Sequence, residues 1–165
     1  DQFVYGPDPW DLNTALHLRE RQIKELVQPG TTHVKYGAGG LLDVEYTVQY
    51  LQLMHGHHLV SIRTPNTLEA IDHLCEEALL TLKEGDELKD NYVFLRQLID
   101  GLRIVRGHAQ GLVLPPSGSD EMVFLARRLG MMTTNWLQGA GDLEHTIHTR
   151  MTQIHEQFLH RFSKH

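Results

Sequence analysis

The sequence predicts an all-α fold, a bundle of about six helices with a buried central helix that begins near Leu41. Almost every segment places its apolar residues at helical spacing, and the alternation typical of strands is nearly absent. Proline and glycine pairs separate these segments. A length of 165 residues with 41% hydrophobic residues suits one domain, residues 1–165, with a core of its own.

Turn and capping residues divide the chain into its predicted helices. Pro29 and Gly30 end the first helix, Gly85 and Asp86 separate the third from the fourth, and Ser119 caps the fifth. One stretch, residues 31–36, is predicted to be extended. The predicted helices cover about residues 10–27, 41–55, 68–83, 87–106 and 120–130, and a last helix carries an apolar face from residue 143 to residue 162. A turn at residues 7–9 leads into the first helix.

The fourth and the last predicted helices carry the clearest apolar faces. Residues three and four apart fall on one side of a helix, so each set forms a stripe that can pack against a core. The two sets are Leu88, Tyr92, Leu95, Leu98, Ile99 and Leu102 in the fourth helix, and Leu143, Ile147, Met151, Ile154, Phe158 and Phe162 in the last.

Composition argues against several classes of protein. A single cysteine, Cys75, rules out a disulfide framework and a cysteine-rich zinc site. The net charge of -6 gives no support to nucleic-acid binding by phosphate neutralisation. No apolar run approaches the ~20 residues that a membrane span needs. We therefore expect a cytoplasmic protein with neither nucleic acid nor membrane as a partner. Because the chain begins at Asp1, we also expect it to be a fragment of a larger polypeptide.

The 12 histidines raise the question of a metal site. A zinc-binding helix motif needs two histidines four residues apart, but His155 and His160 lie one residue too far apart for it. His145 and His148 are helical neighbours without a third ligand at fixed spacing. We therefore expect no metal site in this chain. The other histidines considered, His55, His57 and His58, lie in a predicted helix-ending loop.

The stretch KYGAGGLLDVEY, residues 35–46, has three glycines within residues 37–40, directly before the central helix. The glycines permit a tight turn and close packing, or they expose N–H groups to a phosphate at the helix start. Asp43 and Glu45 point about 200° apart around the helix, so they cannot share one metal ion. The default role of Asp43 is to complement the positive dipole of the helix start.

The central helix is predicted to have two apolar faces with a polar seam between them. Such a helix packs between neighbours on both sides. The seam consists of Glu45, Gln49 and Gln52, whose partners are other side chains of the bundle, a docked domain or a ligand. The two faces are Leu41, Val44, Val48 and Leu51 on one side, and Leu42, Tyr46, Tyr50 and Leu53 on the other.

The stretch KYGAGGLLDVEYTVQYLQLMHG, residues 35–56, resembles the signature K-x-G-x-G-G-[IL]-x-[DE]-[IV]-E-[FY]-x-x-Q-x-x-Q-L-x-x-G of the glutamine synthetase adenylyltransferase family. PII uridylyltransferases carry a looser version. Ala38 and Leu42 depart from the proline and arginine that are common in the family. Further similar segments follow in the family's order and extend the resemblance over nearly the whole chain, at residues 63–67, 92–96, 112–115 and 125–130.

The resemblance implies a helical domain that follows a nucleotidyltransferase domain. The enzyme would transfer AMP from ATP, with Mg²⁺, to a tyrosine of glutamine synthetase. Its metal-binding carboxylates follow a Gly-Ser turn on a strand. Here Gly118, Ser119 and Asp120 precede a helical segment, so we expect no catalytic residue and no cofactor in this chain.

The partners implied are the nucleotidyltransferase domain of the same polypeptide, glutamine synthetase, and a PII protein. Two alternatives are a non-catalytic regulatory or interaction bundle, and part of a uridylyltransferase-type enzyme. We expect Lys35 and Asp43 to lie at a surface that the catalytic domain covers, so that losing the charge of Asp43 costs the isolated domain little. Glu45→Ala is expected to destabilise it. The candidates for domain docking or for the nucleotide cleft are Lys35, Gly37, Gly39, Gly40, Asp43, Glu45 and Gln49.

Overall fold

The computed structural model describes residues 11–107, 111–131 and 134–162. These residues form helices joined by loops, and one isolated antiparallel bridge between His33 and Val113 is the only β-pairing among them. The prediction of an all-α bundle is confirmed. The helices are α1 (Leu12–Leu26), α2 (Leu41–His55), α3 (Thr67–Glu76), α4 (Leu82–Arg106), α5 (Asp120–Arg128) and α6 (Trp136–Phe162).

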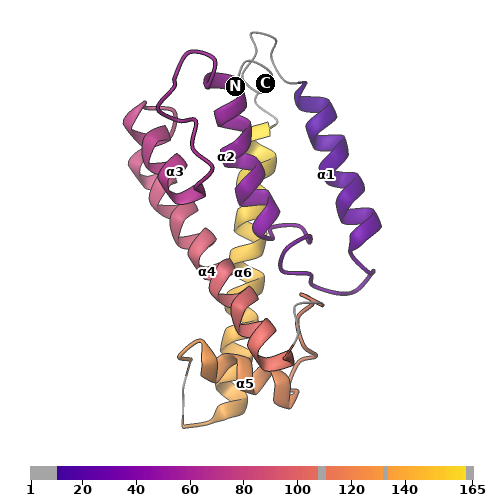
Figure 1. Cartoon of the computed structure of the whole chain (residues 1–165). Helices are drawn as coiled ribbons and strands as arrows, with labels where there is room; N and C mark the ends of the chain where they lie inside the picture. The colour runs from indigo at the N-terminus through magenta and orange to yellow at the C-terminus, as the bar shows by residue number, and fades with distance from the viewer. Residues whose placement is uncertain (1–10, 108–110, 132–133, 163–165) are drawn as a thin grey trace.

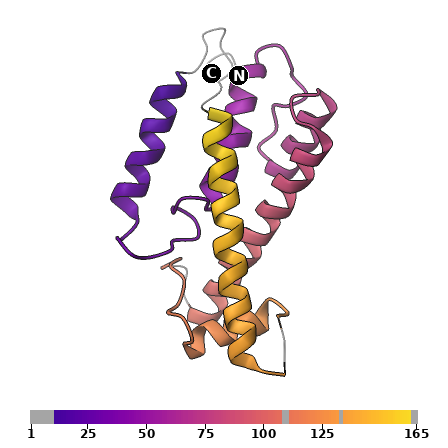
Figure 2. The same ribbon diagram turned by 180° about the vertical axis from the view of Figure 1, so that it is seen from behind.

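The central position of α2 is also confirmed. It packs against α3, α4 and α6, and its residues Leu41, Val44, Val48 and Leu51 are buried. α5 packs against both α4 and α6 at one end of the bundle, whereas α1 stands to one side of the other helices in both views (Figures 1 and 2). In the described part of the chain, no helix is long and apolar enough to cross a membrane.

The boundary between α3 and α4 differs from the prediction, because Gly85 lies inside α4 rather than between two helices. The hydroxyl of Thr81 accepts a hydrogen bond from the N–H of Glu84, and the Glu84 carboxylate accepts one from the N–H of Thr81. This reciprocal cap starts α4 at Leu82. A Cβ at Gly85 would lie 2.3 Å from Sγ of Cys75, so the glycine lets α3 and α4 approach closely.

The remaining boundaries follow the prediction more closely. Ser119 caps α5, its hydroxyl accepting a hydrogen bond from the N–H of Met122. Residues 31–36 form turns with the single bridge instead of a strand. α6 begins at Trp136, before Leu143, the first residue of its predicted apolar face. The predicted helix start at Trp10 and the turn at residues 7–9 lie outside the described residues.

Candidate functional site

The glycine turn, residues 37–40, is packed tightly against its surroundings. Gly39 has φ of 71°, and a Cβ there would lie 1.7 Å from the carbonyl oxygen of Met151 in α6. A Cβ at Gly37 or Gly40 would lie 2.6 or 2.5 Å from a carbonyl oxygen of the preceding loop. The backbone therefore approaches its neighbours more closely than any side chain allows, which explains the glycines.

The N–H groups of the three turn glycines and of residues 41–43 at the helix start have acceptors within the chain. The N–H of Gly39 donates to Oδ2 of Asp43 at 2.7 Å. The N–H groups from Gly40 to Asp43 donate to backbone carbonyls at 2.9–3.2 Å. A phosphate at a helix start needs free N–H groups. The phosphate interpretation is therefore wrong for these donors, and the packing interpretation accounts for the turn.

Asp43 is fully buried, at 0% exposure, so the expectation that it lies at the surface is wrong. Its Oδ1 accepts a hydrogen bond from Nε of Arg19 in α1 at 2.7 Å. Its Oδ2 lies 3.0 Å from Nδ1 of His155 in α6 and accepts the N–H of Gly39. We call Arg19, Asp43 and His155 the Asp43 anchor, because one carboxylate joins α1, α2 and α6 at the glycine turn.

Arg19 is 1% exposed, although it is an arginine on a helix at the edge of the bundle. Its Nη1 and Nη2 donate to the carbonyl oxygens of Tyr36 and Gly37, each at 2.9 Å. Arg19 was not among the residues predicted for the site. The available signal was its position one turn from Ala15 and Ile23 on the inner face of α1, where a solvated arginine is not expected.

The predicted polar seam of α2 divides into a structural part and an accessible part. Gln52 is buried, and its Nε2 donates to the carbonyl oxygens of Ile62 and Thr64 at 2.7 and 2.8 Å. Gln49 is exposed, and Glu45 is half-buried. Gln52 is therefore explained by packing, whereas Glu45 and Gln49 remain accessible to a partner.

Two cations act on Glu45 from other parts of the chain. Burial raises the pKa of the Glu45 carboxyl, and the positive charges of Lys35 and Arg96 oppose this rise. Lys35 is half-buried in the loop before the glycine turn, and Arg96 is exposed on α4. We call Lys35, Glu45, Gln49 and Arg96 the Glu45 face. Arg96 was missed from the sequence, because its closeness to Glu45 depends on how α4 packs on α2.

We expect Glu45→Gln to raise the melting temperature at about pH 7 but not at about pH 4. The raised pKa means that the fold favours the neutral acid. That contribution to stability is present at low pH and is lost as the pH rises through the folded-state pKa. Thermal melts of both chains at the two pH values measure it. A variant that melts lower at neutral pH would show that the carboxylate has a stabilising partner.

The expectation that Glu45→Ala breaks buried hydrogen bonds has no counterpart in the structure. Within the described residues, the Glu45 carboxylate makes no hydrogen bond or ion pair. The carboxylate is thus partly removed from water without a bonding partner among the described residues. This costs free energy of folding, unless a partner outside this chain binds the carboxylate.

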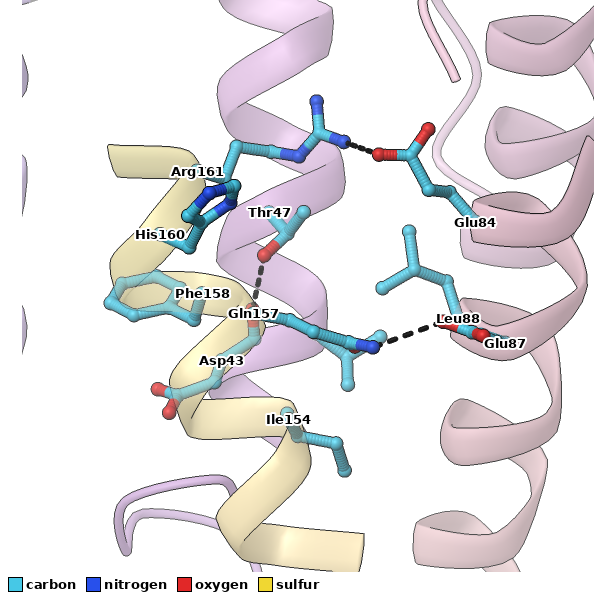
Figure 3. A pocket seen from close by; sticks show the side chains of 11 residues that line it. Asp43, Thr47, Glu84, Glu87, Leu88, Ile154, Gln157, Phe158, His160 and Arg161 are labelled. Carbon is cyan, nitrogen blue, oxygen red and sulfur yellow. Dashed lines mark hydrogen bonds and ion pairs between the residues drawn. The ribbon is translucent and has the colours of Figure 1, made fainter. Parts of the chain in front are cut away.

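A pocket of about 380 Å³ lies between α2, α4 and α6 (Figure 3). Arg161 of α6 bonds Glu84 of α4 at 2.6 Å, and Gln157 bonds Glu87 at 3.0 Å, so polar bridges cross it. Figure 3 shows the carboxylate of Asp43 turned away from α4. Within the described ranges, no group of three or more histidine, cysteine, aspartate or glutamate side chains is placed to hold a metal ion. The apolar lining consists of Val44, Leu88, Ile154 and Phe158.

Comparisons with known proteins agree with the resemblance seen in the sequence. The family model described as GlnD PII-uridylyltransferase matches residues 10–162. A bifunctional glutamine synthetase adenylyltransferase/adenylyl-removing enzyme of Corynebacterium efficiens is 32% identical over 148 residues, which are 90% of this chain and 13% of that protein. The enzyme of the same name from Mycobacterium avium is 40% identical over 105 residues, 62% of this chain and 10% of the relative.

A third relative, the enzyme of the same name from Mycobacterium leprae, is 30% identical over 157 residues, covering 92% of this chain and 16% of the relative. The chain thus spans only 10–16% of the length of these curated relatives.

Proposed function

This chain belongs to the family described as GlnD PII-uridylyltransferase, and we propose that it is the helical accessory domain of an adenylyltransferase-like enzyme. The enzyme would transfer AMP from ATP to a tyrosine of glutamine synthetase. ATP and Mg²⁺ would bind in its nucleotidyltransferase domain, where the tyrosine oxygen displaces pyrophosphate from the α-phosphorus. The names of the similar enzymes support the reaction, and the Glu45 face supports the accessory role.

The observation that carries the accessory role is the state of Glu45. Its side chain is half-buried and burial raises its pKa, while the positive charges of Lys35, in a loop, and of Arg96, on α4, oppose that rise. Charged groups that folding leaves in a costly state gather at functional sites. We infer that the Glu45 face docks against the nucleotidyltransferase domain, whose polar groups would complete the bonding of Glu45 and Gln49.

In the full-length enzyme, we expect Lys35→Met and Glu45→Gln each to lower adenylylation about tenfold or more, without lowering the melting temperature. The loss would come from docking, since neither side chain belongs to the core. The assay measures transfer of labelled AMP to glutamine synthetase. This chain alone should label nothing, because the reaction needs the nucleotidyltransferase domain.

Lys24→Met and Glu20→Gln are the matched controls, because both side chains are exposed on α1. They should leave adenylylation unchanged. Full activity of both docking variants would remove the proposed role of the Glu45 face, while leaving the family membership of the chain untouched.

A second candidate function is uridylyl transfer to a PII protein, in an enzyme for which this chain has the same accessory role. The description of the matching family model favours it. The full-length enzyme distinguishes the two when it is offered labelled ATP or UTP, each with glutamine synthetase or a PII protein. Label from UTP on the PII protein alone would replace the first proposal with the second.

A further inference from the structure

α1 is held to the rest of the bundle by polar contacts and by few buried apolar side chains. Of its described side chains, only Ala15 and Arg19 are buried, while Leu18 and Leu26 are 46% and 49% exposed. Besides the three hydrogen bonds of Arg19, the hydroxyl of Tyr46 in α2 donates to Oε1 of Gln22 at 3.3 Å. Leu16 also packs against the core but is only partly buried, whereas α4 and α6 each bury at least five apolar side chains. Detaching α1 would therefore expose less apolar surface than detaching α4 or α6, and the exposure of apolar surface is what chiefly resists such openings.

Arg19 holds three acceptors that lie around the glycine turn. One is the buried carboxylate of Asp43, and the others are the carbonyls of Tyr36 and Gly37. Tyr36 directly follows Lys35, whose own carbonyl accepts the N–H of Leu42 at 3.2 Å. The position of Lys35 thus depends on the backbone of the next two residues, whose carbonyls the side chain of Arg19 binds.

We propose that Arg19 is the positioning residue of the Glu45 face, and that α1 acts as a latch on it. When α1 is attached, its guanidinium fixes the glycine turn and hence Lys35. When α1 detaches, the Asp43 carboxylate and the carbonyls of Tyr36 and Gly37 lose their bonds from Arg19 in one event. The turn is then left with the N–H of Gly39 on Asp43 and the N–H of Gly40 on Gly37, so it opens together with the helix. What the face binds rests on the proposed function, whereas the latch rests only on the contacts within this chain.

Amide hydrogen exchange on the unmodified chain tests the latch. The amides of α1 and the N–H of Gly39, which Asp43 accepts, should exchange as one unit with the same dependence on dilute denaturant. The buried amides of α4 and α6 should exchange at least about tenfold more slowly. Separate opening of α1 and Gly39, or exchange of both only with the whole bundle, would overturn the proposal.

Arg19→Met, with Arg21→Met as its matched control, tests positioning. Arg21 lies on the outer side of the same helix, where it forms an ion pair with Glu25 at 2.6 Å. The two side chains are 72% and 56% exposed, respectively. Arg19→Met should speed exchange at Gly39 about tenfold or more and leave the α4 and α6 amides unchanged, whereas Arg21→Met should alter neither. Acceleration throughout the chain would make Arg19 a general stabiliser and overturn its positioning role.

Titration with the isolated nucleotidyltransferase domain of the same polypeptide links the latch to docking. Arg19→Met should weaken binding about tenfold, as Lys35→Met does, and Arg21→Met should not. Unchanged binding despite faster exchange at Gly39 would overturn the positioning of the face. Absence of binding by the unmodified chain would refute the proposed docking. The latch would then be decided by the exchange results alone.

Discussion

Replacing Gly39 by alanine is expected to destabilise the chain by roughly 3–5 kcal/mol, a large part of the ~5–15 kcal/mol typical of a domain. The positive φ of 71° alone would cost about 1 kcal/mol. The larger part comes from the new Cβ, which would lie 1.7 Å from the carbonyl oxygen of Met151. That oxygen belongs to the backbone of α6, so no rotamer change relieves the clash. We expect the melting temperature to fall by roughly 10–15 °C.

Gly118→Ala is the control for this prediction. Gly118 has the same φ of 71°, but a Cβ there would meet nothing within 4 Å. It should therefore cost only the backbone strain, about 1 kcal/mol. Denaturant titrations of the two variants and the unmodified chain separate strain from crowding. Equal losses in the two variants would mean that α6 does not press on the glycine turn.

The apolar spacing and the glycines predict most of the fold because both act over short distances in sequence. α2 begins after Gly40 and ends at His55, as the pattern indicates. The boundary of α3 and α4 was missed because Gly85 resembles a helix breaker, whereas its role depends on Cys75 of the neighbouring helix. The spacing of Thr81 and Glu84 is a helix-start signal that can be recognised in the sequence. It correctly indicates that the helix begins before Gly85.

The candidate site was predictable only in part. The site residues predicted from the glycine stretch stay a prediction, and of these Lys35, Glu45 and Gln49 are half-buried or exposed. The role of Asp43 could not be predicted from local pattern, because its partners Arg19 and His155 lie on other helices. The helix dipole alone explains a carboxylate in the first turn of a helix, so nothing in the local sequence indicated that Asp43 is buried.

Asp43→Asn separates those two explanations by magnitude. A helix-start charge contributes about 0.3–1 kcal/mol. Removing one partner of a buried ion pair costs about 3–5 kcal/mol, because the other charge stays buried without compensation. Arg19 would be that charge, at 1% exposure, and an asparagine amide would also place a donor against the donors of Arg19 and Gly39. We therefore expect the larger loss in the isolated chain, measured by denaturant titration.

Asp120→Asn is the matched control, since Asp120 is an exposed aspartate in the first turn of α5. It should lose no more than the helix-start contribution. The double variant Arg19→Met with Asp43→Leu removes both charges. Its loss of stability should therefore be smaller, by roughly 1–3 kcal/mol, than the summed losses of the single variants Arg19→Met and Asp43→Leu. It should still be less stable than the unmodified chain, because the carbonyls of Tyr36 and Gly37 lose the hydrogen bonds from Arg19 in either case. If Asp43→Asn costs no more than Asp120→Asn, Asp43 is only a helix-start charge, and the Asp43 anchor does not hold α1 to the glycine turn.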